Sequence, residues 1–154
     1  MQSIEFVRQH SKWSEQQIEI EYKCHNHTDL DLFIDDHICI GDTLFHPSIG
    51  SARCDFPGGD AELLFNTISR ILAHSDNTTL CLCHDYPDDS RNAETFISIA
   101  EMKSNIHLQR CEGDKQKFCQ LREQRDAELG LPKLIIPSIQ VNIQAGIDLK
   151  AKNK

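Results

Sequence analysis

The sequence predicts a mixed α/β layer fold, and three patterns support this prediction. Apolar and polar residues alternate over residues 18–24, which is typical of a strand with one buried face. Residues 60–74 repeat apolar side chains at the period of a helix, and residues 79–83 form a short apolar run. Strands and helices that follow one another in this way form layered α/β structures.

The N-terminal part of this fold is expected to be a set of neighbouring strands. Residues 30–34 and 37–40 follow the first strand, and Asp35 and Asp36 between them suit a tight hairpin turn. Prolines and glycines then interrupt residues 41–59, so we expect a long loop there. Loops of this length inside a compact domain are usually functional or disordered.

Helices are expected in most of the remaining chain. Asp60 is a suitable N-cap for a helix that runs to about residue 74, and further helices are expected over residues 93–103 and 115–129. Residues 134–141 are apolar but contain Pro137, which favours an edge strand or an irregular segment. The helical faces expected to be buried are Leu64, Ile68, Ile71 and Leu72 in the first helix and Phe118, Leu121, Arg125 and Leu129 in the last.

Length and composition indicate one domain over residues 18–146, between a poorly defined segment at 1–17 and a flexible tail at 147–154. With 39% hydrophobic and 26% charged residues, the chain resembles ordinary globular proteins that bury a core.

The net charge of −8 argues against nucleic acid or anionic membranes as partners. No apolar run reaches the roughly 20 residues that cross a bilayer, and residues 1–17 lack the apolar core of a secretory signal. Because seven cysteines occur without an export signal, we expect reduced thiols in the cytoplasm.

Three polar clusters contain side chains that could bind a metal ion. They are residues 24–28, 41–45 and 83–87, and each directly follows a predicted strand. Strand ends often carry sites because the rigid backbone holds the ligand groups in place. The histidines and aspartates of these clusters suit Fe(II), Zn(II) or Mn(II). A structural role is the alternative for each histidine, and packing is the more common role for thiols such as Cys81 and Cys83.

The order of these motifs resembles that of the metallo-β-lactamase superfamily. The sequences GDTLF at 41–45, ARCDFPGGDA at 52–61 and CHDYP at 83–87 are most similar to persulfide dioxygenases and to β-lactamase hydrolase-like proteins. The resemblance covers residues 18–146 and implies part of an αββα sandwich, mainly its C-terminal half.

By this resemblance, His27, Asp42 and His84 fall on metal-ligand positions of the superfamily. The histidine at the position of His84 completes a dinuclear site in the glyoxalase II relatives, whereas in the dioxygenases it generally does not bind the iron. The metal implied is Fe(II), which the dioxygenases hold with two histidines and an aspartate, and zinc is the alternative. The sequence departs from the family pattern because Asn26 stands in place of a glycine and no His-x-His-x-Asp-His motif precedes His27. The ligand set is therefore expected to be incomplete without a homodimer partner or a separate N-terminal half.

The activity implied is oxidation of glutathione persulfide by O2 to sulfite and glutathione. Arg53 and Tyr86 fall beside the substrate pocket, where they could bind anionic groups of the thiol; a loop-bracing arginine and a packed tyrosine are the alternatives. Asp85 is expected to orient a ligand or the loop. Three functions stay open: a truncated relative with reduced or no activity, an enzyme completed by a partner chain, and a non-enzymatic binding or regulatory remnant. Within the enzyme class, the rival chemistry is glyoxalase II-like hydrolysis of a thioester by metal-activated water.

Overall fold

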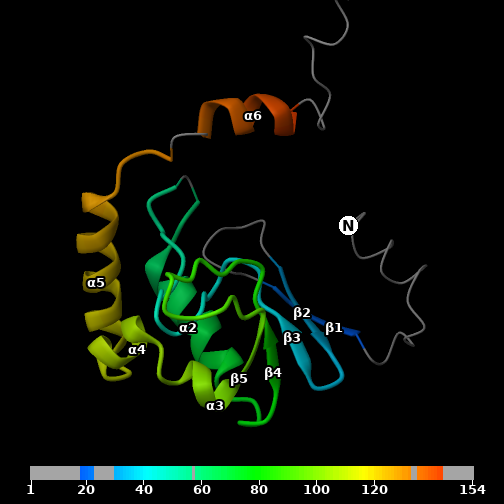
Figure 1. Cartoon of the computed structure of the whole chain (residues 1–154). Helices are drawn as coiled ribbons and strands as arrows, with labels where there is room; N and C mark the ends of the chain where they lie inside the picture. The colour runs from blue at the N-terminus through cyan, green and yellow to red at the C-terminus, as the bar shows by residue number, and fades with distance from the viewer. Residues whose placement is uncertain (1–17, 23–29, 57, 133–134, 144–154) are drawn as a thin grey trace, which may run out of the picture.

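The computed structural model describes residues 18–22, 30–56, 58–132 and 135–143, and it contains a five-stranded sheet with helices beside it (Figure 1). The predicted mixed α/β fold is thus confirmed. The segments predicted at 1–17 and 147–154 lie outside the described residues. Neighbouring strands in the sheet follow the order of the chain: β1 (Ile18–Tyr22), β2 (Leu30–Ile34), β3 (His37–Cys39), β4 (Thr79–Cys81) and β5 (Phe96–Ser98).

The sheet is antiparallel except for the pair β3 and β4, which is parallel. The predicted hairpin between β2 and β3 is confirmed, with Asp35 at a φ of 55° in the turn. Helix α2 (Ala61–Ile71) connects the parallel pair, as such a crossover requires. Because β3 and β4 are parallel, the chain leaves both strands at the same edge of the sheet. The polar clusters that follow them therefore meet.

The hydrophobic core lies between the sheet and α2. Ile38, Leu80 and Ile97 are register partners on β3, β4 and β5, and all three are buried. Figure 1 shows α5 (Lys115–Glu128) packed along α2, and the Phe65 and Phe118 rings meet with centroids 5.4 Å apart. The buried apolar side chains that α2 adds to the core are Leu64, Ile68 and Ile71.

Helix α2 begins where the sequence predicts. Asp60 Oδ1 accepts hydrogen bonds from the backbone N–H groups of Glu62 (2.8 Å) and Leu63 (2.9 Å), so two N-terminal donors are satisfied. The helix ends at Ile71 rather than near residue 74. The strands β3 and β4 also end one and two residues earlier than predicted.

The helix predicted over residues 93–103 is wrong. Its first part is β5, whose Ile97 pairs with Leu80, and only α3 (Ile99–Met102) is helical. The switch occurs at Ser98, which forms a reciprocal capping box with Glu101 and starts the helix there. A second short helix, α4 (Ile106–Cys111), was not predicted.

Helix α5 matches its predicted range, but the predicted buried face is only partly right. Phe118 is buried as expected, whereas Arg125 and Leu129 are exposed and the buried partners of Phe118 are Arg122 and Asp126. A buried ion pair thus occupies the inner face together with Phe118.

The irregular or edge segment predicted over residues 134–141 is also wrong, because α6 (Ile135–Ile143) is a helix. Pro137 is the third residue of this helix. In the first turn no N–H has an intrahelical acceptor, so proline removes no hydrogen bond there. Among the described residues, no helix is both long and apolar enough to span a bilayer.

Candidate metal centre

Asp42, Cys83 and His84 lie together beyond the carboxyl ends of the parallel strands β3 and β4. Their potential ligand atoms are all within 4.8 Å of one another. The Nε2 atom of His84 is 3.3 Å from Asp42 Oδ1, and the thiol of Cys83 donates to the same oxygen at 2.9 Å. The group therefore offers one carboxylate, one thiol and one imidazole at one point of the molecule.

These separations fit one tetrahedral metal ion. Two ligand atoms at 2.0–2.3 Å from such an ion lie roughly 3.3–3.7 Å apart, so the observed distances require only small side-chain shifts. Nearly half of each side chain is exposed at Asp42 and His84, which leaves the group open to ions from solvent. A carboxylate, a thiolate and an imidazole form a donor set that suits Zn²⁺.

The structure brings together two of the three predicted metal ligands. Asp42 and His84 are adjacent, whereas His27 lies outside the described residues. Cys83 was not predicted as a ligand, because paired thiols on one strand usually pack. The signal that could have identified it is its position after the end of β4, because the alternation that would direct a thiol into the core stops with the strand. The Cys83 thiol also donates to the Gly41 carbonyl at 2.9 Å.

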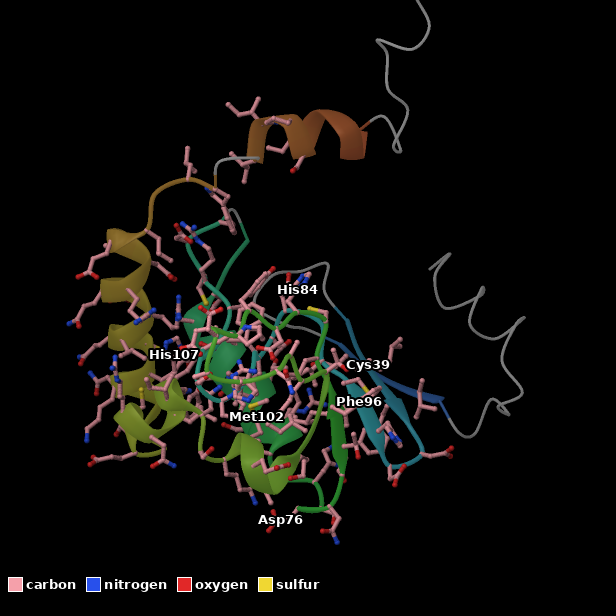
Figure 2. The ribbon with its side chains drawn as sticks, viewed as in Figure 1. Cys39, Asp76, His84, Phe96, Met102 and His107 are labelled. Atoms are coloured by element: carbon pink, nitrogen blue, oxygen red, sulfur yellow. The ribbon has the colours of Figure 1, made fainter. Side chains whose placement is uncertain are left out.

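Tyr86 covers one side of the His84 ring. The two ring planes are inclined by 24° with centroids 5.8 Å apart, and Tyr86 itself is 69% exposed. Both side chains line a cavity of about 770 Å³, together with Asp42 and Arg53. Figure 2 shows His84 near the end of the sheet from which this group extends. Four of the five predicted site residues that the structure describes therefore line one cavity, and Asp85 is the exception.

Arg53 braces the loop that precedes α2. Its Nε and Nη2 atoms donate to the two carboxylate oxygens of Asp55 at 2.6 and 2.5 Å, and Nη1 donates to the Gly130 carbonyl at 3.2 Å. Its guanidinium carbon lies 4.7 Å from the centroid of the Phe56 ring. Because Arg53 also lines the cavity, these contacts hold a cation in a fixed place at its wall.

Asp85 holds the loop after His84. Its side chain is only 1% exposed and accepts hydrogen bonds from Arg91 Nη1 and Nη2 at 2.6 and 2.7 Å and from the Glu94 backbone N–H at 2.8 Å. The hydrogen bonds from Arg91 hold the pKa of the Asp85 carboxyl well below its usual range. Asp85 thus fixes the backbone next to His84 and keeps its charge in the folded state.

The lining of the cavity also includes His107 and Arg122, each 2% exposed. The Nδ1 atom of His107 accepts a hydrogen bond from the Ser51 backbone N–H at 2.9 Å and lies 3.4 Å from Arg122 Nη1. Gly50 makes room for the ring: it has a φ of +116°, and a Cβ atom there would lie 2.3 Å from His107 Cε1. Strand alternation and helical periodicity did not indicate this cluster, because its members come from a loop and two helices that are separate in sequence.

Replacement of Gly50 by alanine is expected to destabilise the fold by about 3 kcal/mol, because it adds both left-handed backbone strain and a clash with a buried ring. Gly113→Ala is the matched control, since Gly113 has a φ of +74° with open space around its Cα. It should lose only about 1 kcal/mol. Denaturant unfolding measures the loss of stability in both variants. Equal losses would show that the clash with the His107 ring does not contribute to the effect of Gly50→Ala.

His107 is expected to make the protein sensitive to acid. Burial, assisted by the nearby Arg122 charge, lowers the pKa of His107 to about 4. An unfolded histidine titrates near 6.5, so between these values the unfolded chain binds a proton that the folded chain excludes. The free energy of unfolding should therefore fall as the pH drops from about 6.5 to 4, by about 3 kcal/mol in total for this group. His107→Asn should remove this part of the pH dependence, and an unchanged slope in the variant would contradict the assignment.

The chain is similar to several known proteins over most of its described length. It matches no protein-family model. It is 45% identical over 112 residues to glyoxylase B2 of Dictyostelium discoideum. The matched stretch covers 72% of this chain and 38% of that protein. A probable metallo-hydrolase of Burkholderia pseudomallei is 44% identical over 70% of this chain and 36% of its own length. A β-lactamase hydrolase-like protein of Xylella fastidiosa is 41% identical over 73% of this chain and 26% of its own length.

The fold agrees with these sequence matches. The crystal structure of ETHE1 from Myxococcus xanthus superposes with a TM-score of 0.65 and 28% identity, over 85% of this chain and 56% of that one. The chain spans about a quarter to two fifths of the length of the three relatives named above. From these relatives and this shared fold, we conclude that the chain belongs to the metallo-β-lactamase superfamily and carries part of its fold.

Proposed function

We propose that the chain belongs to a metal-dependent enzyme of the persulfide dioxygenase type, which oxidises a small thiol persulfide such as that of glutathione. The observation that carries this proposal is the position of Asp42 and His84 on the wall of a cavity that Arg53 also lines. Similarity to ETHE1 supports the same class. A bound Fe(II) would supply the site at which the substrate sulfur and O2 react.

The residues of this chain would bind the metal and position the substrate. Asp42 and His84 supply oxygen and nitrogen ligands, and the stacked Tyr86 ring restricts the orientation of His84. Arg53 presents a cation, already held by Asp55, to an anionic substrate. Asp85 and Arg91 keep the loop after His84 closed against the protein.

The remaining metal ligands would come from outside the described residues. Within the chain, His27 is the candidate. A second polypeptide, either another copy of this chain or a separate N-terminal half, is the other source. A protein that lacks them would bind metal weakly and have reduced or no activity alone.

A second candidate function is hydrolysis of a thioester by zinc-activated water. The thiol of Cys83, 2.9 Å from Asp42, favours this alternative because a thiolate ligand suits Zn²⁺ better than the two-histidine, one-carboxylate set of the iron oxygenases. The relatives named as a glyoxylase and a metallo-hydrolase agree with it.

Purified protein should be analysed for metal and then supplied with glutathione persulfide and with a glutathione thioester. For a dioxygenase we expect bound iron, O2 uptake and equimolar sulfite from the persulfide. Thioester cleavage without O2 uptake, by zinc-loaded protein, would replace the first proposal with the second. If the protein shows neither activity after reconstitution with iron and with zinc, both enzyme proposals fail and a non-enzymatic binding protein remains.

A further inference from the structure

A pair of thiols lies on the face of the sheet opposite the hydrophobic core. Cys39 ends β3 and Cys81 ends β4, and the two residues are register partners in the parallel pair. A side-chain hydrogen bond joins the thiols, so their sulfur atoms are neighbours. Successive side chains of a strand point to opposite faces, so Ile38 and Leu80 enter the core whereas the two thiols face away from it.

Ions from solvent can reach this pair. Both thiols are partly exposed, and Phe96, the register partner of Cys81 on β5, is 65% exposed. Figure 2 shows Cys39 and Phe96 at the sheet, whereas His107 lies beside α4 and α5. Neither thiol is part of the lining of the cavity that contains His84. The pair is therefore a separate feature of the surface.

The spacing of the strands favours an ion between the two sulfur atoms over a disulfide. Neighbouring strands are about 4.8 Å apart, and the side chains of register partners extend side by side at this spacing. A disulfide needs Cβ atoms about 3.8 Å apart, so it would have to draw the strands together. Two thiolates on opposite sides of one ion, with metal–sulfur bonds of roughly 2.3 Å, place the sulfur atoms about 4.6 Å apart. Cys39 and Cys81 can reach this separation by rotation of their side chains alone.

The number of donors selects the kind of ion. Structural Zn²⁺ sites and iron–sulfur clusters need four protein ligands. Among the described residues, the group of three potential ligands is Asp42, Cys83 and His84, and it includes neither Cys39 nor Cys81. Cu(I) is a soft ion with a filled d shell, which thiolates select and which is stable with two of them as its ligands. A pair of thiols without a third donor therefore suits Cu(I) better than Zn²⁺.

We propose that Cys39 and Cys81 form a two-coordinate Cu(I) site that bridges β3 and β4 on the face of the sheet opposite the core. Each thiol gives its proton to solvent when its sulfur binds the ion, and two copper–sulfur bonds form. No electron is transferred, because the ion binds as Cu(I) and stays in that state. The site is independent of the proposed function, since Asp42, His84 and Arg53 take no part in it.

Competition with a chromogenic Cu(I) chelator measures the affinity of the reduced full chain without oxygen. All proteins in this series carry Cys83→Ser, because the Cys83 thiolate could bind Cu(I) beside Asp42. We expect Cys39→Ser and Cys81→Ser each to weaken Cu(I) binding about 100-fold or more, because each removes one of two direct ligands. Cys119→Ser, which changes a partly exposed thiol of α5, is the matched control and should keep the affinity of its parent.

X-ray absorption of the Cu(I)-loaded parent should find two sulfur neighbours of the ion and no nitrogen or oxygen. A different set of neighbours, or a Cys39→Ser protein that binds Cu(I) as tightly as its parent, would overturn the site.

A second measurement needs no variant and stays decisive where a serine variant does not fold. In the wild type, Cu(I) should protect Cys39 and Cys81 from alkylation, as mass spectrometry of the peptides detects, while Cys119 reacts at an unchanged rate. Alkylation of Cys39 and Cys81 at the same rate with and without Cu(I) would refute the proposal, because sulfur atoms bound to the ion cannot attack the reagent.

Discussion

Asp126→Asn is expected to destabilise the protein by about 3 kcal/mol, although the substitution changes neither the size nor the shape of the side chain. The Asp126 carboxylate accepts from Arg122 Nη2 with one oxygen and from the Cys54 backbone N–H, at 2.7 Å, with the other. Both side chains of the ion pair are at most 5% exposed. The asparagine variant would leave the Arg122 guanidinium buried without an opposite charge, and this uncompensated charge is the source of the loss.

An exposed ion pair between α5 and α2 provides the control. Lys115 and Glu62 lie 2.5 Å apart with about half of each side chain exposed, so Glu62→Gln should cost far less stability than Asp126→Asn. A double replacement of Arg122 by methionine and Asp126 by leucine should recover much of the stability, because it removes both charges together. Denaturant unfolding of the three variants tests the ranking. A loss at Asp126→Asn no larger than that at Glu62→Gln would show that water reaches the buried pair.

Local sequence signals predicted the elements that depend on neighbouring residues. The strands at 30–34 and 37–39, the turn at Asp35 and the capped start of α2 at Asp60 all follow from alternation, turn chemistry and capping. The same signals explain one error. The capping box at Ser98 and Glu101 shows that α3 begins at Ile99, so the aromatic and β-branched residues before it could have been recognised as a strand.

Features that depend on distant contacts could not be predicted in the same way. Periodicity placed Arg125 and Leu129 on the inner face of α5, whereas tertiary contacts bury the polar pair Arg122 and Asp126. An acidic side chain in a helix is normally solvated. Asp126 is buried because it pairs with Arg122 and accepts from the Cys54 N–H, which is 72 positions away in sequence.

The group Asp42, Cys83 and His84 contains two residues that sequence motifs predicted and one that they did not. Asp42 and His84 were predicted from motifs that follow strands, and the parallel pairing of β3 and β4 brings the two motifs together. Cys83 was interpreted as packing because alternation would place it with Cys81 on one face of a longer β4. The strand instead ends at Cys81, and the next residues turn toward Gly41 and Asp42. The length of a strand, which is the least certain part of a sequence-based prediction, decides whether this thiol is a ligand.

Cys83→Ser is therefore expected to weaken Zn²⁺ binding about 100-fold, because a serine hydroxyl is a poor substitute for a thiolate. Loss of a residue that only hydrogen-bonds a metal ligand already weakens metal binding about 10- to 100-fold, and loss of the ligand itself should cost at least as much. Competition with a chromogenic chelator measures the affinity. In the Co²⁺-loaded wild type we expect thiolate-to-metal charge-transfer absorption that the variant lacks. Cys81→Ser is the matched control, since Cys81 ends β4 two positions earlier and is not part of the group.

The outcome of this substitution also distinguishes the two candidate functions. If Cys83 binds the metal, its thiolate joins Asp42 and His84 in a set that favours zinc, and hydrolytic chemistry becomes the better supported activity. If Cys83→Ser binds metal as tightly as the wild type and the cobalt spectrum shows no thiolate band, the thiol only donates to Gly41 and Asp42. The ion would then need a ligand from outside the described residues, such as His27. That result would favour the two-histidine, one-carboxylate site of the dioxygenases, in which Asp42, His27 and a further histidine would hold Fe(II) with positions open for O2 and sulfur.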